Sequence, residues 1–320
     1  MAEPLIQIKN LTVRFPTEQG DAFAVNHLSL NIPQGNVLGL VGESGCGKSL
    51  TGLSILRLVP PPGMVDAETL KFKDQNLLDL APDEMRKIRG SQIALIPQDP
   101  LTSLNPVYTI GDQIIEVLQL HKGLNKEDAT KRTIELLDRV RIPNAKDRIH
   151  EYPHQFSGGM RQRVMIAMAL SCEPQLLIAD EPTTALDVTV QAQILALMRE
   201  IQQENGTAIM LITHDLGVVA EMCDHVAVMY AGRIVEEAPV RDLFKDPKHP
   251  YTQGLLNSLP TMTRTRLEPI DGQPPMITEI PQGCSFEPRC KDRLATCTES
   301  FPTPVKITPD HPVSCYLYNK

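Results

Sequence analysis

The sequence contains no tryptophan, and aromatic residues make up only 4 % of its 320 positions. Proteins that bind single-stranded nucleic acid stack bases on aromatic side chains, so we expect no such platform here. The chain also lacks an excess of positive charge, because its formal net charge is −8 at pH 7. Nucleic acid is bound by clustered lysine and arginine, and we therefore expect no nucleic-acid partner.

Long hydrophobic runs are also missing. No apolar run approaches the roughly 20 residues that a helix needs to span a bilayer. The first residues, Met1-Ala2-Glu3-Pro4, lack the basic and then apolar form of a signal peptide. At 320 residues the chain is long enough for one large domain with or without an appendage, and its 42 % of hydrophobic residues suits a core. We expect a cytoplasmic protein unless a partner holds it at a membrane.

The seven cysteines are spread unevenly. Four of them crowd the end of the chain with the spacing C-x5-C-x6-C-x17-C: Cys284, Cys290, Cys297 and Cys315. A cytoplasmic chain keeps its thiols reduced, so this group suggests a metal before a disulfide. Four thiolates can bind a [4Fe–4S] cluster or Zn²⁺, although the C-x2-C pairs typical of zinc ribbons are absent.

One glycine-rich segment fits the phosphate-binding pattern G-x-x-x-x-G-K-[ST]. Its members are Gly42, Glu43, Ser44, Gly45, Cys46, Gly47, Lys48 and Ser49. An apolar run at 37–41 precedes it, and a helix-like stretch from Leu50 to Leu58 follows, so strand, loop and helix come in the required order. Backbone N–H groups of the loop would surround phosphate oxygens at a helix N-terminus. Lys48 would reach the β- and γ-phosphates of a nucleotide, and Ser49 would ligate Mg²⁺.

Hydrophobic patterning predicts an α/β protein. Short strands are expected near the start, at 5–8, 11–15 and 24–32. Buried strands are expected at 93–96, 176–179 and 208–212, helices at 110–140, 160–171 and 188–204, and a hairpin at 226–236. Alternating apolar strands and helices imply a mostly parallel sheet covered on both faces. Asn125 is a plausible N-cap within the helical stretch 110–140. Past about Pro260 the periodicity disappears, which predicts a small irregular appendage.

The predicted strand at 176–179 ends in two acids, Asp180 and Glu181. Asp180 would hold Mg²⁺ through its water shell, and Glu181 would act as the general base for the water that attacks a γ-phosphate. An acidic end on an ordinary strand is the alternative interpretation.

A Ser-Gly-Gly sequence, Ser157-Gly158-Gly159, stands before the predicted helix at 160–171. Alone it reads as a helix cap or as a second anion-receptive N-terminus. The sequence lies about twenty residues before the acidic strand. In this position it resembles the LSGGQ signature of ABC-type ATPases, with Phe156 for Leu and Met160 for Gln. By this resemblance, Ser157 would act on the nucleotide of a partner subunit.

Further segments match the same family in order. Gln98 resembles the Q-loop glutamine near Mg²⁺ and the attacking water, and Asp187 resembles the D-loop acid that faces the partner. His214 resembles the switch histidine that binds the γ-phosphate. Phe15 stands where the family places an aromatic residue on adenine, with Phe23 as the alternative. The resemblance covers roughly residues 5–245.

The family resemblance implies a P-loop ABC-type ATPase domain over residues 1–245. This domain would have a mixed sheet core, an antiparallel β subdomain and a helical subdomain at about 100–170, and a Cys-rich extension would follow at 246–320. The segment His249-Pro250-Tyr251 and its continuation to Leu256 resemble the C-terminal motif of dipeptide, oligopeptide and nickel importer ATPases, and so does the segment 99–106. The extension of peptide importers holds an iron–sulfur cluster, so the resemblance implies [4Fe–4S] over zinc, free thiols or a disulfide.

The resemblance implies an ATP- and Mg²⁺-dependent ATPase that powers peptide import from the cytoplasmic face of the inner membrane. Its partners would be a second ATPase subunit, homologous or identical, and two membrane permease subunits. An extracytoplasmic peptide-binding protein would act indirectly. Three alternatives are the same machinery carrying nickel or another small solute, a soluble ABC ATPase acting on nucleic acid or ribosomes, and a nucleotide-gated scaffold without ATPase activity. The negative charge, the single ATPase domain and the intact Glu181 and His214 oppose the last two.

Overall fold

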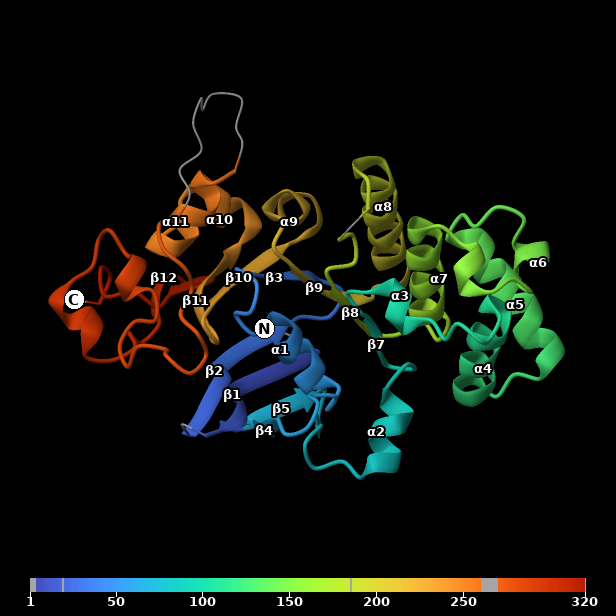
Figure 1. Cartoon of the computed structure of the whole chain (residues 1–320), viewed down its shortest axis with the longest axis horizontal. Coiled ribbons are helices and arrows are strands. Elements are labelled where there is room, and N and C mark those ends of the chain that lie inside the picture. The colour runs from blue at the N-terminus through green and yellow to red at the C-terminus, as the bar shows by residue number, and fades with distance from the viewer. Residues whose placement is uncertain (1–3, 19, 185, 260–269, 320) are drawn as a thin grey trace. The chain divides into compact units, whose positions relative to one another are not determined.

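The computed structural model describes residues 4–18, 20–184, 186–259 and 270–319. The chain forms two compact units, one made of Met1–Leu78 with Ile212–Lys320 and the other of 79–211 (Figure 1). No helix in these described ranges is long and apolar enough to cross a membrane.

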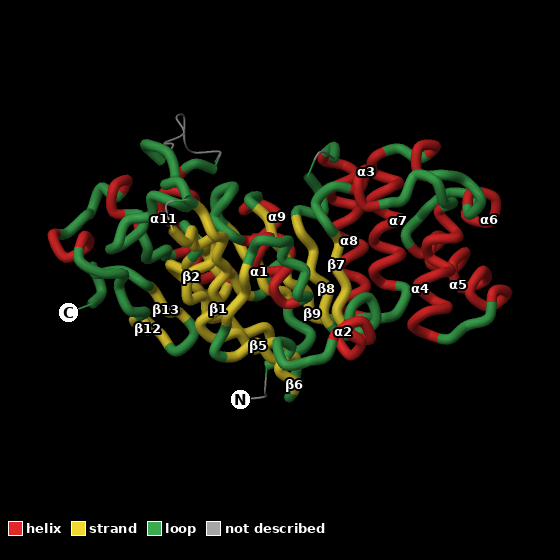
Figure 2. The backbone as a smooth tube through the Cα atoms, turned by 60° about the horizontal axis from the view of Figure 1, so that its bottom comes forward, coloured by secondary structure: helices red, strands yellow, loops and turns green. Residues whose placement is uncertain are grey.

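The first unit contains an antiparallel sheet built on two long strands, β1 (Ile6–Thr17) and β2 (Gly20–Ile32). Shorter strands β4 (Met64–Asp66), β5 (Thr69–Phe72) and β6 (Gln75–Asn76) complete it. Figure 2 labels β1, β2, β5 and β6 of this sheet among the yellow strands. The sequence predicted two separate strands where β1 runs unbroken. The pairing shifts register between Ile8 and Leu11, and Asn10 there adopts a φ of 51°. A β-bulge of this kind interrupts the alternation of apolar residues without ending the strand.

A second sheet of this unit has the strand order β12-β13-β11-β10-β3. Its strands are β3 (Val37–Val41), β10 (His225–Tyr230), β11 (Arg233–Pro239), β12 (Val305–Thr308) and β13 (His311–Val313). β3 and β10 run parallel, while β10 and β11 form the predicted hairpin. The expectation of an irregular appendage missed β12 and β13, which extend this sheet from the far end of the chain. Strands of three and four residues are too short to show a clear alternation.

Helices cover the second sheet of the first unit. Figure 1 shows α9, α10 and α11 on one side of β3, β10 and β11, with α1 and the antiparallel sheet on the other. Their bounds are α1 Lys48–Ile55, α9 Leu216–Met222, α10 Val240–Lys245 and α11 Pro250–Asn257, with 3₁₀ turns at Glu287–Arg289 and Ala295–Thr298.

The second unit contains the buried strands that the sequence predicted. β7 (Ile93–Ile96) runs parallel to β8 (Leu176–Asp180), and β9 (Ala208–Thr213) runs on to the boundary of the first unit. All residues of β8 and β9 are buried, as expected for strands covered on both faces.

Helices make up the rest of the second unit. Figure 2 shows α4, α5 and α7 as neighbours. The helices are α2 Pro82–Ile88, α3 Pro100–Ser103, α4 Ile110–Lys122, α5 Lys126–Arg139, α6 Ala145–Arg148, α7 Gly158–Leu170 and α8 Val188–Asn205, with a 3₁₀ turn at Pro153–Gln155. The prediction of Asn125 as an N-cap is confirmed, because its Oδ1 accepts from the Asp128 N–H at 2.9 Å.

Candidate nucleotide-binding and hydrolysis site

The glycine-rich loop joins β3 to α1 in the first unit, and two of its glycines are required by close packing. A Cβ added to Gly42 would lie 2.2 Å from the carbonyl oxygen of Met229. One added to Gly47, which has a φ of +105°, would lie 2.3 Å from the carbonyl oxygen of Ala24. Side chains are therefore excluded at both ends of the loop, and the backbone passes close to β10 and β2.

Lys48 lies over this loop. Its ammonium donates to the carbonyl oxygens of Gly42 at 2.8 Å and Glu43 at 3.0 Å, and the residue is only 6 % exposed. A buried cation beside loop amides and a helix N-terminus forms a site for a phosphate anion.

A cavity of about 460 Å³ opens on this loop. Glu43, Ser44, Gly45 and Cys46 form one side of it, and the tail segment 274–278 contributes another. Ser49 and Leu50 follow in the first turn of α1, where both are half-buried. Burial raises the pKa of the Cys46 thiol in spite of the Lys48 charge, so the thiol is neutral.

In the second unit the acidic end of β8 and Gln98 come together. β7 and β8 are parallel, with Ile96 opposite Ala179, so the residues after both strands emerge at one edge. Gln98 donates its Nε2–H to Glu181 Oε2 at 2.8 Å, and the Thr184 hydroxyl donates to the same oxygen at 2.9 Å. Glu181 adopts a φ of 46°. Residues held in this left-handed region carry strain, which is common at functional sites.

Ser157 lies at the N-cap of α7. Its hydroxyl accepts from the Met160 N–H at 3.4 Å, and both Ser157 and Gly158 are exposed. Phe156 is 2 % exposed, and the Arg148 guanidinium lies 5.7 Å from its ring centre. The departure from Leu is thus a change of buried packing. At Met160 only the backbone amide serves the cap, so its side chain is not needed there.

The two other motif residues lie at helix starts. Asp187 accepts from the Val190 N–H at 3.0 Å as the N-cap of α8, while Ala185, expected in the same motif, lies outside the described residues. His214 is exposed directly after β9 and belongs to the first unit. The next residue, Asp215, caps α9 through the N–H groups of Gly217 and Val218.

Phe15 and Phe23 project from opposite faces of the antiparallel sheet. Phe15 pairs with Ala22, and Phe23 pairs with Arg14, so the two rings occupy adjacent rather than equivalent register positions. Successive pairs alternate between faces, so a single bound base would meet one ring and not both. The Phe15 ring lies against Gly63, whereas Phe23 is 37 % exposed.

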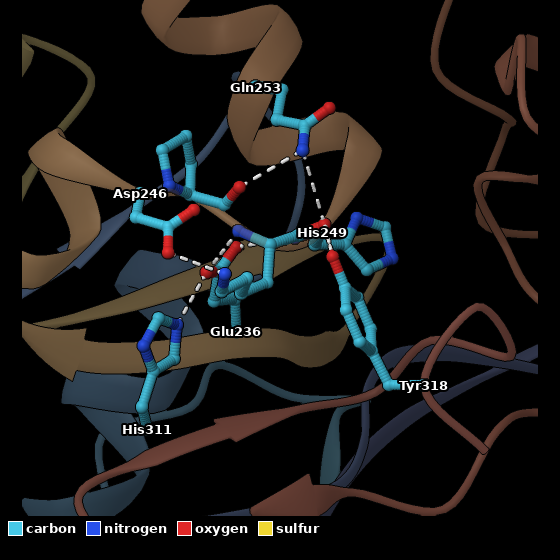
Figure 3. Close-up of polar contacts among 8 residues, drawn as sticks. Glu236, Asp246, His249, Gln253, His311 and Tyr318 are labelled. Atoms are coloured by element: carbon cyan, nitrogen blue, oxygen red, sulfur yellow. Dashed lines mark hydrogen bonds and ion pairs between the residues drawn. The ribbon is translucent and has the colours of Figure 1, made fainter. Parts of the chain in front are cut away.

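The segment His249-Pro250-Tyr251 begins α11 and is held by a buried carboxylate (Figure 3). Glu236 is fully buried and accepts from the N–H groups of Lys248 and His249, both at 2.8 Å. His311 from β13 contacts the same carboxylate through Nε2 at 2.7 Å. His249 Nδ1 in turn accepts from the Tyr251 N–H at 3.1 Å, which caps the helix.

Two residues of the extension reach the glycine-rich loop at 42–49, called the phosphate loop from here on, and neither contact was predicted from the sequence. Tyr251 and Arg289 bind Glu43 directly. The motif around Tyr251 marked the segment, but nothing in the sequence pointed to Arg289.

The four late cysteines lie in the first unit. Cys284, Cys297 and Cys315 are buried and Cys290 is half-buried. Burial, with a smaller contribution from the neighbouring thiols, raises the pKa of Cys284 and of Cys315 to about 11. Within the described ranges, no three His, Cys, Asp or Glu side chains are placed to hold a metal ion.

Comparison with known proteins identifies the family. Residues 25–184 match the model of the ABC transporter family, and residues 235–297 match the C-terminal region of oligopeptide/dipeptide transporters. The chain belongs to the ABC transporter family of ATP-binding proteins. It is 48 % identical to the dipeptide transport ATP-binding protein DppD of Bacillus subtilis, over 99 % of this chain and 96 % of the relative. It is 51 % identical to the oligopeptide transport ATP-binding protein OppD of Haemophilus influenzae, over 92 % of this chain and 91 % of the relative.

Solved structures agree with this ABC family assignment. A dimeric ATP-binding cassette in a post-hydrolysis state with ADP and Pi is 28 % identical to the chain, with a TM-score of 0.64. The match covers 74 % of this chain and 99 % of that structure. The predicted ABC-type ATPase fold is confirmed.

Replacing Gly47 with alanine should destabilise the ABC domain and abolish nucleotide binding. Alanine at positive φ costs roughly 1 kcal/mol, and the clash with the Ala24 carbonyl adds about 1–3 kcal/mol. Gly45→Ala is the matched control, because Gly45 also has positive φ but nothing lies within 4 Å of an added Cβ. Urea unfolding of both variants measures the difference. Equal losses of stability would contradict the packing argument.

Because of His249, the protein should become less stable as pH falls. Burial lowers its pKa to about 3 from 6.5, so below pH 6.5 the unfolded chain binds a proton that the folded chain excludes. Stability present above pH 6.5 is therefore lost as pH falls toward 3, by about 2 kcal/mol at pH 5. His249→Asn keeps a capping side chain that does not titrate. Unfolding free energies at pH 8 and pH 5 should show a smaller loss in this variant, and an equal loss would refute the assignment.

Proposed function

We propose that this chain is the ATP-hydrolysing subunit of an ABC importer for dipeptides and oligopeptides. One observation supports the proposal most strongly. A glycine-rich loop with a buried lysine lies in the same unit as an extension that matches peptide transporters. The relatives that match over nearly the full chain are named for dipeptide and oligopeptide transport. Nickel or another small solute is the alternative cargo, and none of the comparisons quoted above favours it.

Residues of the phosphate loop would bind ATP. Lys48 and the backbone amides of residues 44–49 would bind the phosphates, with Phe15 as the proposed adenine contact and Phe23 as the alternative. By the family resemblance, Ser49, Asp180 and Gln98 would supply oxygen donors to Mg²⁺, which prefers hard oxygen ligands. The bound ion would supply positive charge against the β- and γ-phosphate oxygens.

Glu181 and His214 would carry out the hydrolysis of ATP. The Glu181 carboxylate would take a proton from the water that attacks the γ-phosphate, and Gln98, which already donates to Glu181, would keep that carboxylate oriented. His214 would donate a hydrogen bond to the γ-phosphate. These are the roles that the family resemblance assigns to the matching positions.

The working form would be a pair of ATPase subunits, homologous or identical. Ser157 and Gly158 are exposed at a helix N-terminus, which suits contact with a nucleotide held by the partner. By the family resemblance, Gly159 would complete the motif and Asp187 would face the partner. Two membrane permease subunits would hold the pair at the cytoplasmic face of the inner membrane, and an extracytoplasmic peptide-binding protein would deliver cargo. No nucleic acid takes part in this scheme.

The [4Fe–4S] cluster implied for Cys284, Cys290, Cys297 and Cys315 is a prediction of the sequence that the described geometry does not support. No step of hydrolysis depends on it. Zinc is the alternative metal at these positions.

ATP-dependent uptake of a labelled dipeptide tests the cargo. Cells lacking this chain should regain uptake when it is restored, and unlabelled di- and tripeptides should compete. Glu181→Gln should abolish uptake while ATP binding persists, because the variant lacks the general base. Glu127→Gln, the same chemical change at an exposed residue of α5, is the control and should transport normally.

Two outcomes of this experiment would count against the proposal. Restored Ni²⁺ uptake without any effect of peptides would move the protein to the nickel alternative. Full uptake by the Glu181→Gln variant would remove Glu181 from the catalytic role.

Anaerobic purification tests whether the four late cysteines bind a metal. A bound cluster would give brown protein with about four irons and four sulfides per chain. A colourless protein with zinc would support the alternative metal. A metal-free protein in which all four thiols react with a thiol reagent after denaturation would support the geometry seen here.

A further inference from the structure

The second residue of the phosphate loop, Glu43, is bound by the C-terminal extension. Its backbone N–H donates to the Tyr251 hydroxyl oxygen at 2.9 Å, and its carboxylate accepts two hydrogen bonds from Arg289, at 2.7 and 3.0 Å. All three residues belong to the first unit. The extension therefore reaches the loop at both the backbone and the side chain of one residue.

Tyr251 is fixed on every side. It is fully buried, its ring lies 4.6 Å from that of Tyr230 and 5.3 Å from that of Phe286, and its own N–H is capped by His249. A hydroxyl on so rigid a ring places its hydrogen-bond acceptor accurately. The segment that begins α11 thus has a purpose at the phosphate loop.

Arg289 is also held rigidly. Its side chain is 6 % exposed, Nε donates to the Asp271 carbonyl at 3.0 Å, and Nη1 donates to the Tyr230 hydroxyl at 3.3 Å as well as to Glu43. The two bonds to Glu43 form the bidentate geometry that makes guanidinium–carboxylate pairs strong.

The charge of Glu43 explains why this contact matters. A carboxylate within a loop that binds phosphate would repel the ligand, and the repulsion is strong where solvent is partly excluded. Arg289 neutralises that carboxylate and draws it toward the extension. Tyr251 meanwhile satisfies the Glu43 amide, so the loop keeps its turn after Gly42.

Resting on the ATPase function proposed above, we propose that Arg289 and Tyr251 are positioning residues of the phosphate loop and set the affinity of this protein for ATP. They act through Glu43 and do not touch the nucleotide. The tail segment 274–278, which walls the same cavity as Ser44 and Gly45, ties the extension to that site by a second route.

The experiment is a double-mutant cycle on the purified full-length chain, read as the dissociation constant for a fluorescent ADP analogue and as the KM and kcat of ATP hydrolysis. Arg289→Gln should raise the dissociation constant and KM on the order of tenfold, because it leaves Glu43 unpaired beside the phosphates. The same change in a Glu43→Gln background should have less than about a twofold effect, since no carboxylate then needs a partner.

Two milder variants guard against loss of folding. Arg289→Lys keeps the charge but not the paired geometry and should raise the dissociation constant about threefold. Tyr251→Phe keeps the ring packing and removes only the acceptor, with a similar expected rise. Arg293→Gln, in the same extension with an exposed side chain paired to Glu287, is the control and should bind like the wild type.

The outcomes separate this inference from the proposed function. Wild-type protein that binds no nucleotide would overturn the ATPase function itself. Wild-type binding with no effect of Arg289→Gln would overturn the positioning role. An equal effect in the presence and absence of the Glu43 carboxylate would also overturn it, because the arginine would then act only on the fold.

Discussion

The close approach of the phosphate loop to the backbone of β10 governs much of the first unit. Gly42 has no room for a side chain because the Met229 carbonyl faces it, so loop and strand stay in fixed relation. The next residue of that strand, Tyr230, packs on Tyr251 and accepts a hydrogen bond from Arg289. One short stretch of β10 therefore fixes the loop directly and also holds the residues of the extension that bind Glu43.

The neighbouring strand β11 holds the extension through a charge. Glu236 is fully buried, and a buried carboxylate is costly unless it is hydrogen-bonded or paired. Its partners are two backbone N–H groups at the start of α11 and a histidine of β13 (Figure 3). Losing any of these would leave charge or a polar group uncompensated, so the start of α11 and the last strand are tied to one point. The hairpin β10–β11 is thus the scaffold on which the ATPase part and its extension meet.

Sequence reasoning recovered the features that depend on neighbours along the chain. The buried strands β8 and β9, the N-cap Asn125 and the loop at 42–49 all follow from local pattern, because propensity, capping and glycine spacing act over a few residues. What it missed depends on distant partners. Glu43 and Arg289 are 246 positions apart, and the paired residues Glu236 of β11 and Val313 of β13 are 77 positions apart. No local pattern encodes such pairs, and an arginine on a proline-rich tail looks like any solvated charge.

Two residues depart from the LSGGQ signature, and neither departure changes an atom proposed to act in function. Phe156 replaces an apolar residue where the side chain is buried, and Met160 contributes its amide to the cap of α7, so neither change touches the exposed Ser157 hydroxyl. Glu43 is the opposite case, an acid at a variable position of a loop whose purpose is to bind anions. The loop tolerates this charge because Arg289 of the extension forms an ion pair with it. An ATPase domain with this loop sequence but without the extension would expose that carboxylate to the phosphates, so the extension belongs to the nucleotide site as well as to the tail.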